Sequence, residues 1–156
     1  MTTFNEVNEK VSADIRDYGW HVLKILGEGD EPPFGYSIGL VETFGHPEIM
    51  IIGLKLDLIH SLINSMGEAI RDGHIYKSGS FDSDLLEGYD CYFTSVYDIH
   101  YDNHFGKAQN YYGNDDFPVL QCVYPSVKGV FPWDRNWPKE LKSLQPLLGD
   151  SPDNKS

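Results

Sequence analysis

The sequence has few basic residues, and it lacks any long apolar run. Only 12 of its 156 residues are Lys or Arg, against 24 Asp and Glu, which gives a formal net charge of -12. Nucleic acids and anionic lipids are bound through Lys and Arg, so this charge argues against a direct nucleic-acid or membrane role. No apolar run approaches the roughly 18 residues of a membrane span, and no signal-peptide pattern opens the chain. We therefore expect a cytoplasmic protein.

Cysteine is also scarce, and the known nucleotide-binding loops are missing. Cys91 and Cys122 lie in separate apolar segments without CxxC spacing. We expect two reduced core thiols, with a disulfide or a metal-binding pair as the alternative. No Gly-rich loop opens a helix with the P-loop or dinucleotide pattern. The sequence therefore predicts no cofactor.

The apolar residues that are present suffice for one core, and residues 34–54 are expected to organise it. Apolar residues make up 40% of the chain, which excludes a disordered protein despite the charge. Alternation over residues 36–40 and a continuous apolar run over residues 49–52 predict two buried strands. Residues 45–47, Gly-His-Pro, predict a tight turn between these strands.

Helical periodicity occurs in three further segments. The first helix is predicted from a capping box at Thr3 and Glu6 to a stop at Gly19. The second has Asp57 as its N-cap and Gly73 as its end, and the third covers residues 138–148. A short helix or packed loop is expected within residues 100–112.

Strands are predicted at residues 20–26, 89–96 and 119–124, and residues 74–88 are expected to form a short strand and an exposed acidic loop. Short connections favour antiparallel pairing. The fold class is therefore α+β, with a mainly antiparallel or barrel-like sheet covered by about three helices. A split barrel of the flavin-reductase type is one option. Residues 1–149 are expected to form a single domain, followed by a disordered polar tail at 150–156.

Several short segments occur in an order typical of one bacterial family. They are DYGW at 17–20, FGYSIGL at 34–40, GHPE at 45–48, the pair Tyr111 and Tyr112, VLQCVYP at 119–125, FPWD at 131–134 and LQPLLG at 144–149. Together they resemble the bacterial domain of unknown function 4262 over nearly the whole chain. The resemblance implies a single compact domain and no established activity.

One candidate catalytic cluster lies at the predicted turn. His46 and Glu48 flank Pro47, and Tyr36 and Ser37 are expected on the adjacent strand. A carboxylate beside an imidazole can orient a general base, and a serine can act as a nucleophile. However, Ser37 is not in a G-x-S-x-G elbow. The favoured interpretation is that His46 and Glu48 hydrogen-bond the turn and hold the hairpin.

His100 and His104 are a weak candidate pair for a metal. Their spacing puts both imidazoles on one helix face, but a zinc site needs a third protein ligand, which no flanking motif supplies. We therefore predict no metal site.

Acidic residues are clustered in three predicted loops, and these are the candidate protein-binding residues. They are Glu28, Asp30 and Glu31, then Asp82, Asp84 and Glu87, and finally Asp115 and Asp116. Unpaired carboxylates are rarely buried, so all eight should be solvated.

The sequence favours a non-enzymatic module that binds a basic protein partner, most concretely an immunity protein, or antitoxin, against a basic toxin. This expectation follows from the acidic clusters and from the absence of a complete catalytic motif. The alternative is a small enzyme or a cofactor-binding protein of the flavin split-barrel type, with a pocket around the GHPE turn.

Overall fold

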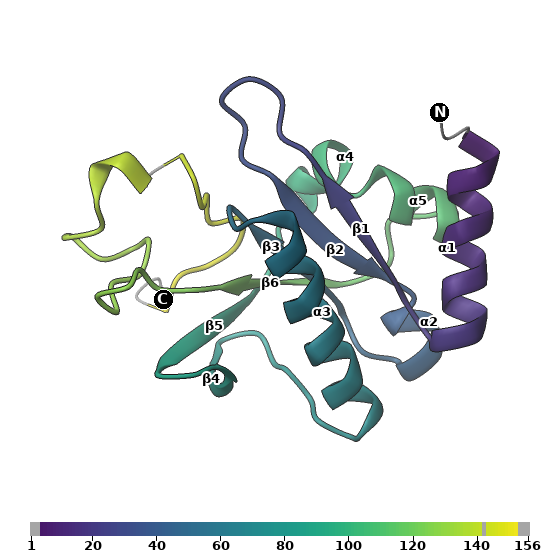
Figure 1. The fold of residues 1–156 in the computed structure, drawn as a ribbon, viewed down its shortest axis with the longest axis horizontal. Coiled ribbons are helices and arrows are strands. Elements are labelled where there is room, and N and C mark those ends of the chain that lie inside the picture. Colours follow the sequence, from purple (N-terminus) through teal and green to yellow (C-terminus); the bar gives the residue numbers. More distant parts are fainter. Residues whose placement is uncertain (1–3, 142, 153–156) are drawn as a thin grey trace.

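A computed structural model describes residues 4–141 and 143–152, and the side chains from residue 8 onward (Figure 1). The helices are α1 (Phe4–Tyr18), α2 (Leu40–Phe44), α3 (Leu56–Arg71), α4 (Tyr101–His104) and α5 (Gly106–Tyr112), with short 3-10 turns at Asp98–His100 and Lys139–Leu141. The strands are β1 (His21–Ile25), β2 (Phe34–Ile38), β3 (Glu48–Ile52), β4 (Ser80–Leu86), β5 (Tyr89–Ser95) and β6 (Val119–Val123). In the described part of the chain, no helix is both long enough and apolar enough to cross a bilayer.

The six strands form one open sheet in the order β1-β2-β3-β6-β5-β4. All neighbouring pairs are antiparallel except β3 and β6, which run parallel. The predicted α+β class with a mainly antiparallel sheet is therefore confirmed. Because β1 and β4 are free edges, the sheet does not close into the barrel that was the other option.

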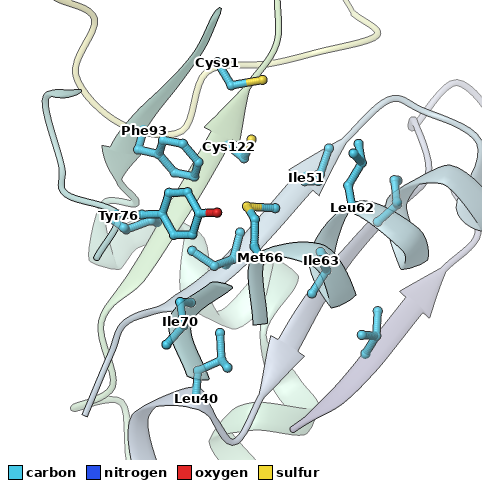
Figure 2. Packing of buried hydrophobic residues seen from close by; sticks show 14 of the residues in the cluster. Leu40, Ile51, Leu62, Ile63, Met66, Ile70, Tyr76, Cys91, Phe93 and Cys122 are labelled. Carbon is cyan, nitrogen blue, oxygen red and sulfur yellow. The ribbon is translucent and has the colours of Figure 1, made fainter. Parts of the chain in front are cut away.

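Strand β3 lies near the middle of the sheet and is buried on both faces. Ile49 and Ile51 belong to the cluster packed under α3, which Figure 2 shows with Leu62, Ile63 and Met66 of that helix. Met50 and Ile52 belong to a second cluster on the opposite face, formed with side chains of α1, α4 and α5. A strand covered on both faces needs apolar residues at successive positions, which explains the continuous run at 49–52.

The two strands predicted within residues 34–54 are present and pair antiparallel, with Tyr36 opposite Met50. Their connection differs from the predicted tight turn, because α2 occupies Leu40–Phe44 before the turn. Gly45 ends this helix with φ 66°, a left-handed conformation that favours glycine.

Three other local predictions were wrong. The second long helix begins at Leu56 with Lys55 as its N-cap, so Asp57 lies in the first turn. The acidic segment at 82–86, predicted as part of a loop, is strand β4, which has an irregular register between Asp82 and Leu86. The helix predicted at 138–148 is only the short 3-10 turn.

The segment that follows this turn is held mainly by Gln121 of β6. Gln121 Nε2 donates to the Pro146 carbonyl at 2.8 Å, and the Leu148 amide donates to Gln121 Oε1 at 2.8 Å. The predicted capping box involves Thr3, which lies outside the described residues, as does the end of the polar tail from 153 onward. Asp150, the first residue of that tail, accepts hydrogen bonds from Thr94 and Tyr97.

Candidate functional site

Glu48 is the centre of a buried hydrogen-bond cluster. Its carboxylate accepts hydrogen bonds from the Ser37 hydroxyl at 2.7 Å and from the Tyr112 hydroxyl at 2.5 Å. The backbone N–H groups of Gly39, Leu40 and Val41 donate to the same carboxylate at 3.0, 3.1 and 3.2 Å. These N–H groups begin α2, where no helical carbonyl is available to them, so Glu48 caps this helix from the next strand.

The local sequence fixes this arrangement. Gly39 has φ 118°, a conformation that residues with side chains rarely adopt, and this residue turns the chain from β2 into α2. Gly45 and Pro47 then return the chain to β3, so Glu48 begins the strand beside the end of β2. Ser37 also accepts a hydrogen bond from the Ile49 amide at 3.0 Å, which joins the two strands.

Burial raises the pKa of Glu48 above its usual value, while its hydrogen bonds from Tyr112, Ser37 and the α2 backbone oppose the rise. Burial and the nearby Glu48 charge raise the pKa of Tyr112. The tyrosine therefore keeps its proton and donates it to the carboxylate. All the donors in this cluster bind Glu48, so the cluster supplies the hydrogen bonds that one buried carboxylate needs.

His46 is not part of this cluster. Its Nδ1 lies 2.8 Å from the Pro47 carbonyl, and the Tyr76 amide donates to its Nε2 at 3.1 Å. Nε2 must be unprotonated to accept that bond, so Nδ1 carries the proton and donates it to Pro47. The ring thus joins the turn to the segment that follows α3, and burial lowers the pKa of His46.

The four predicted catalytic candidates are brought together only in part. Ser37 contacts Glu48, whereas Tyr36 packs edge-on against Phe105 at 5.0 Å in the second hydrophobic cluster. Exposure is 0% for Ser37 and Glu48, 1% for Tyr36 and 5% for His46. A substrate would have no access to these groups in this structure.

The eight acidic candidates lie at three places on the sheet. Glu28, Asp30 and Glu31 are exposed in the loop between β1 and β2, whereas Asp115 and Asp116 are exposed ahead of β6. Asp84 and Glu87 are exposed on β4 and in the β4–β5 turn, while Asp82 is partly buried and contacts His74 at 3.1 Å.

The strand directions decide which of these carboxylates share an end of the sheet. The pairing of β1 to β6 puts the β1–β2 loop and the β4–β5 turn at one end, and the segment before β6 at the other. Glu87 therefore lies at the same end as Glu28, Asp30 and Glu31, whereas Asp115 and Asp116 lie at the opposite end.

His100 and His104 lie close together, with ring centroids 6.1 Å apart. His104 Nδ1 is 3.0 Å from the carbonyl of His100, within their own helical turn. Within residues 8–141 and 143–152, no group of three or more His, Cys, Asp or Glu side chains is placed to hold a metal.

Cys91 and Cys122 are free, buried thiols on the neighbouring strands β5 and β6 (Figure 2). A hydrogen bond with Cys91 and burial raise the pKa of Cys122, so the thiol form is favoured.

Sequence reasoning missed two contributions to these sites. Tyr112 was noted only as part of a family segment, and no local pattern connects it to Glu48, 64 residues earlier. A polar cavity between α1 and α3 was also missed. Its only sequence signal is a polar residue at every fourth position on each helix, which is typical of any solvated helix face.

The chain was compared with known proteins by family, by sequence and by structure. Searches of the curated proteins and of the solved structures gave no match. A family model described as Domain of unknown function (DUF4262) matches residues 14–138, which include every strand and the whole Glu48 cluster. The chain belongs to this family, as the order of its short sequence segments predicted.

Proposed function

We propose that this chain is a non-enzymatic module that binds a basic protein, most concretely an immunity protein that neutralises a basic toxin. The observation that carries the proposal is a set of exposed carboxylates at one end of the sheet: Glu28, Asp30, Glu31 and Glu87. In the described part of the chain, none of the four has a Lys or Arg ion-pair partner. The negative charge of these carboxylates can therefore attract a cationic surface of a partner.

One exposed aromatic side chain of β4 adds apolar surface. Phe81 is 50% exposed and packs edge-on against Phe131, a partly buried residue of the segment after β6, at 5.7 Å; Phe131 stacks on Trp133 at 4.7 Å. Aromatic side chains contribute much of the binding energy of protein interfaces.

The alternative function, an enzyme or cofactor site around the GHPE turn, has little support: among its four candidate residues, only Tyr36 has a buried polar atom without a hydrogen-bond partner in the described part of the chain. His46 and Glu48 are buried, and their polar atoms are already bonded within the protein. Both residues act on the turn and on α2, which is the structural role favoured by the sequence.

The test compares two matched double charge reversals. The probe is the protein recovered by crosslinking from the producing cells and then purified. Glu28→Lys/Glu31→Lys should slow its association with this chain. Asp115→Lys/Asp116→Lys, with the same change of charge at the other end of the sheet, should leave the rate nearly unchanged. Equal effects from the two variants would contradict the proposed binding end.

A further inference from the structure

Two polar stripes face each other across edge strand β1. Each stripe has members four residues apart, which places them on one face of a helix. They are Lys10, Asp14 and Tyr18 on α1, and His60, Asn64 and Glu68 on α3. Between them lies a cavity of about 490 Å³, also lined by His21 and Lys24 of β1. This volume is within the range of small-molecule sites.

Asp14 orients the His21 ring and fixes which ring nitrogen carries the shared proton. The Asp14 carboxylate lies 2.7 Å from His21 Nδ1 and 2.9 Å from Lys10 Nζ. Nδ1 therefore donates its proton to Asp14, and the acid is already satisfied by two partners. His21 Nε2 has no hydrogen-bond partner in the part of the chain that the structure describes.

His60 carries a buried polar atom that is unsatisfied in the protein. Its Nδ1 has no hydrogen-bond partner in the described structure, although buried nitrogen atoms are rarely left unpaired. Burial lowers the pKa of the His60 imidazole, the charges of Lys24 and His21 lower it further, and those of Asp57 and Asp14 oppose the shift. Lys24 itself has no ion-pair partner among the described residues.

Trp20 is 7% exposed and lines the cavity with the small part of its fixed ring that the protein leaves uncovered. Its Nε1 donates to Asn64 Oδ1 at 3.0 Å, and the guanidinium of Arg71 lies 4.9 Å from its ring. A Cβ atom on Gly67 would come within 2.5 Å of this ring, so only glycine allows α3 to pack so closely. The indole is thus held before any ligand arrives.

We infer that this cavity binds a small organic oxyanion, a carboxylate or a phosphate, with an apolar body against Trp20. The anionic oxygens pair with Lys24 and with the N–H at Nε2 of His60, since Nδ1 of that ring is enclosed by the protein, at the end of the cavity where Lys10 already balances the charge of Asp14. Glu68 lies two helical turns away from His60, or about 12 Å, and shares that end of the cavity with the oppositely charged Arg71, which is bonded to the Tyr18 carbonyl. This site is separate from the proposed protein-binding end of the sheet and does not depend on it.

The inference is tested with three probes that share one apolar body. Sodium benzoate, phenyl phosphate and neutral benzamide are titrated at constant ionic strength, and the imidazole NMR signals of His21 and His60 are followed. Benzoate, phenyl phosphate or both should shift these signals saturably, and which of them does so identifies the oxyanion. Benzamide should not shift them, because it lacks the charge that Lys24 recognises.

Matched lysine variants complete the experiment. Lys24→Gln should weaken oxyanion binding about ten-fold, because a charge-assisted hydrogen bond is lost. Lys128→Gln removes the same charge from an exposed turn outside the cavity and should leave binding unchanged. The inference fails if neither anion gives a saturable shift at concentrations up to about 10 mM, ten times the dissociation constant of a 1 mM ligand. It also fails if benzamide binds equally well or if Lys24→Gln binds like the original chain.

Discussion

Ser37 and Glu48 lie on different strands, 11 residues apart in the chain, yet the serine hydroxyl donates to the carboxylate at 2.7 Å in a fully buried site. The same hydroxyl accepts the Ile49 amide, and the same carboxylate accepts the first amides of α2. One buried acid thus joins β2, α2 and β3. This explains why a carboxylate can be buried without a Lys or Arg partner.

Tyr112→Phe tests how much this acid depends on its donors. The substitution removes a hydroxyl that donates to Glu48 and also accepts the Gly39 amide. Since hydrogen bonds to charged groups contribute more than neutral ones, we expect a loss of about 1.5–3 kcal/mol in the free energy of unfolding. Urea denaturation measures this loss.

Tyr111→Phe is the matched control. Its hydroxyl donates to Glu42, an exposed carboxylate, at 2.6 Å. Water can replace that bond, so the loss should stay below about 1 kcal/mol. Equal losses for the two tyrosines would contradict the special role of Glu48.

His46→Ala should lower stability and reduce its pH dependence. Burial lowers the pKa of His46 below its usual value of 6.5, so the unfolded state binds the proton more tightly than the folded state. The stabilisation by neutral His46 is therefore complete above pH 6.5 and is lost as pH falls through the lower, folded-state pKa. At neutral pH, the variant should be less stable by about 1 kcal/mol for each lost hydrogen bond.

The measurement is the difference in unfolding free energy between the original chain and His46→Ala, from about pH 7.5 to about pH 5. This difference should narrow as the pH falls. A constant or widening difference would mean that the ring is not held neutral between Pro47 and Tyr76.

Ile51→Ala tests the central strand. Ile51 is 0% exposed and packs under α3, so its truncation should leave a cavity and destabilise the protein by about 2–5 kcal/mol. Val127→Ala, at a position that is 86% exposed, should change stability by less than about 0.5 kcal/mol. The measurement is the midpoint of chemical denaturation of each variant. Similar midpoints for the two variants would contradict the central structural role of β3.

Gly39→Ala and Gly45→Ala separate steric crowding from backbone conformation. Both glycines have positive φ, 118° and 66°, but a Cβ on Gly39 would come within 2.8 Å of the Gly19 carbonyl oxygen, whereas Gly45 faces open space. We expect Gly45→Ala to cost about 1–2 kcal/mol in unfolding free energy, from backbone conformation alone. Gly39→Ala should cost at least about 1 kcal/mol more, because of crowding. Equal thermal shifts would argue against the tight packing of Gly39 against the end of α1.

The sequence predicted the parts of the fold that have a local pattern. The α3 helix follows from apolar periodicity, β3 from a continuous apolar run and β5 from β-branched and aromatic content, and these patterns survive packing because the elements are largely buried. The segment at 138–148 did not follow its pattern, because Gln121 of β6 bonds its backbone in an irregular conformation. That contact is non-local, so helix propensity could not anticipate it.

The site around His46 and Glu48 was likewise predicted only where its residues are close in the chain. Proximity in the chain identified His46 and Glu48 and suggested that they hold the turn, but it could not show that they bond to different partners. Those partners, Tyr76 and Tyr112, come from distant segments. The cavity beside β1 depends on the juxtaposition of α1 and α3, which no single segment encodes.

The proposal that an acidic end of this protein binds a basic partner is tested most directly by the salt dependence of the association rate. Stopped-flow mixing with the purified partner, from about 0.01 M to about 1 M NaCl, shortens the Debye length from about 30 Å to about 3 Å. The proposal predicts that the association rate constant falls steeply over this range, while the dissociation rate constant changes much less. An association rate constant that is flat with salt would contradict electrostatic attraction by Glu28, Asp30, Glu31 and Glu87.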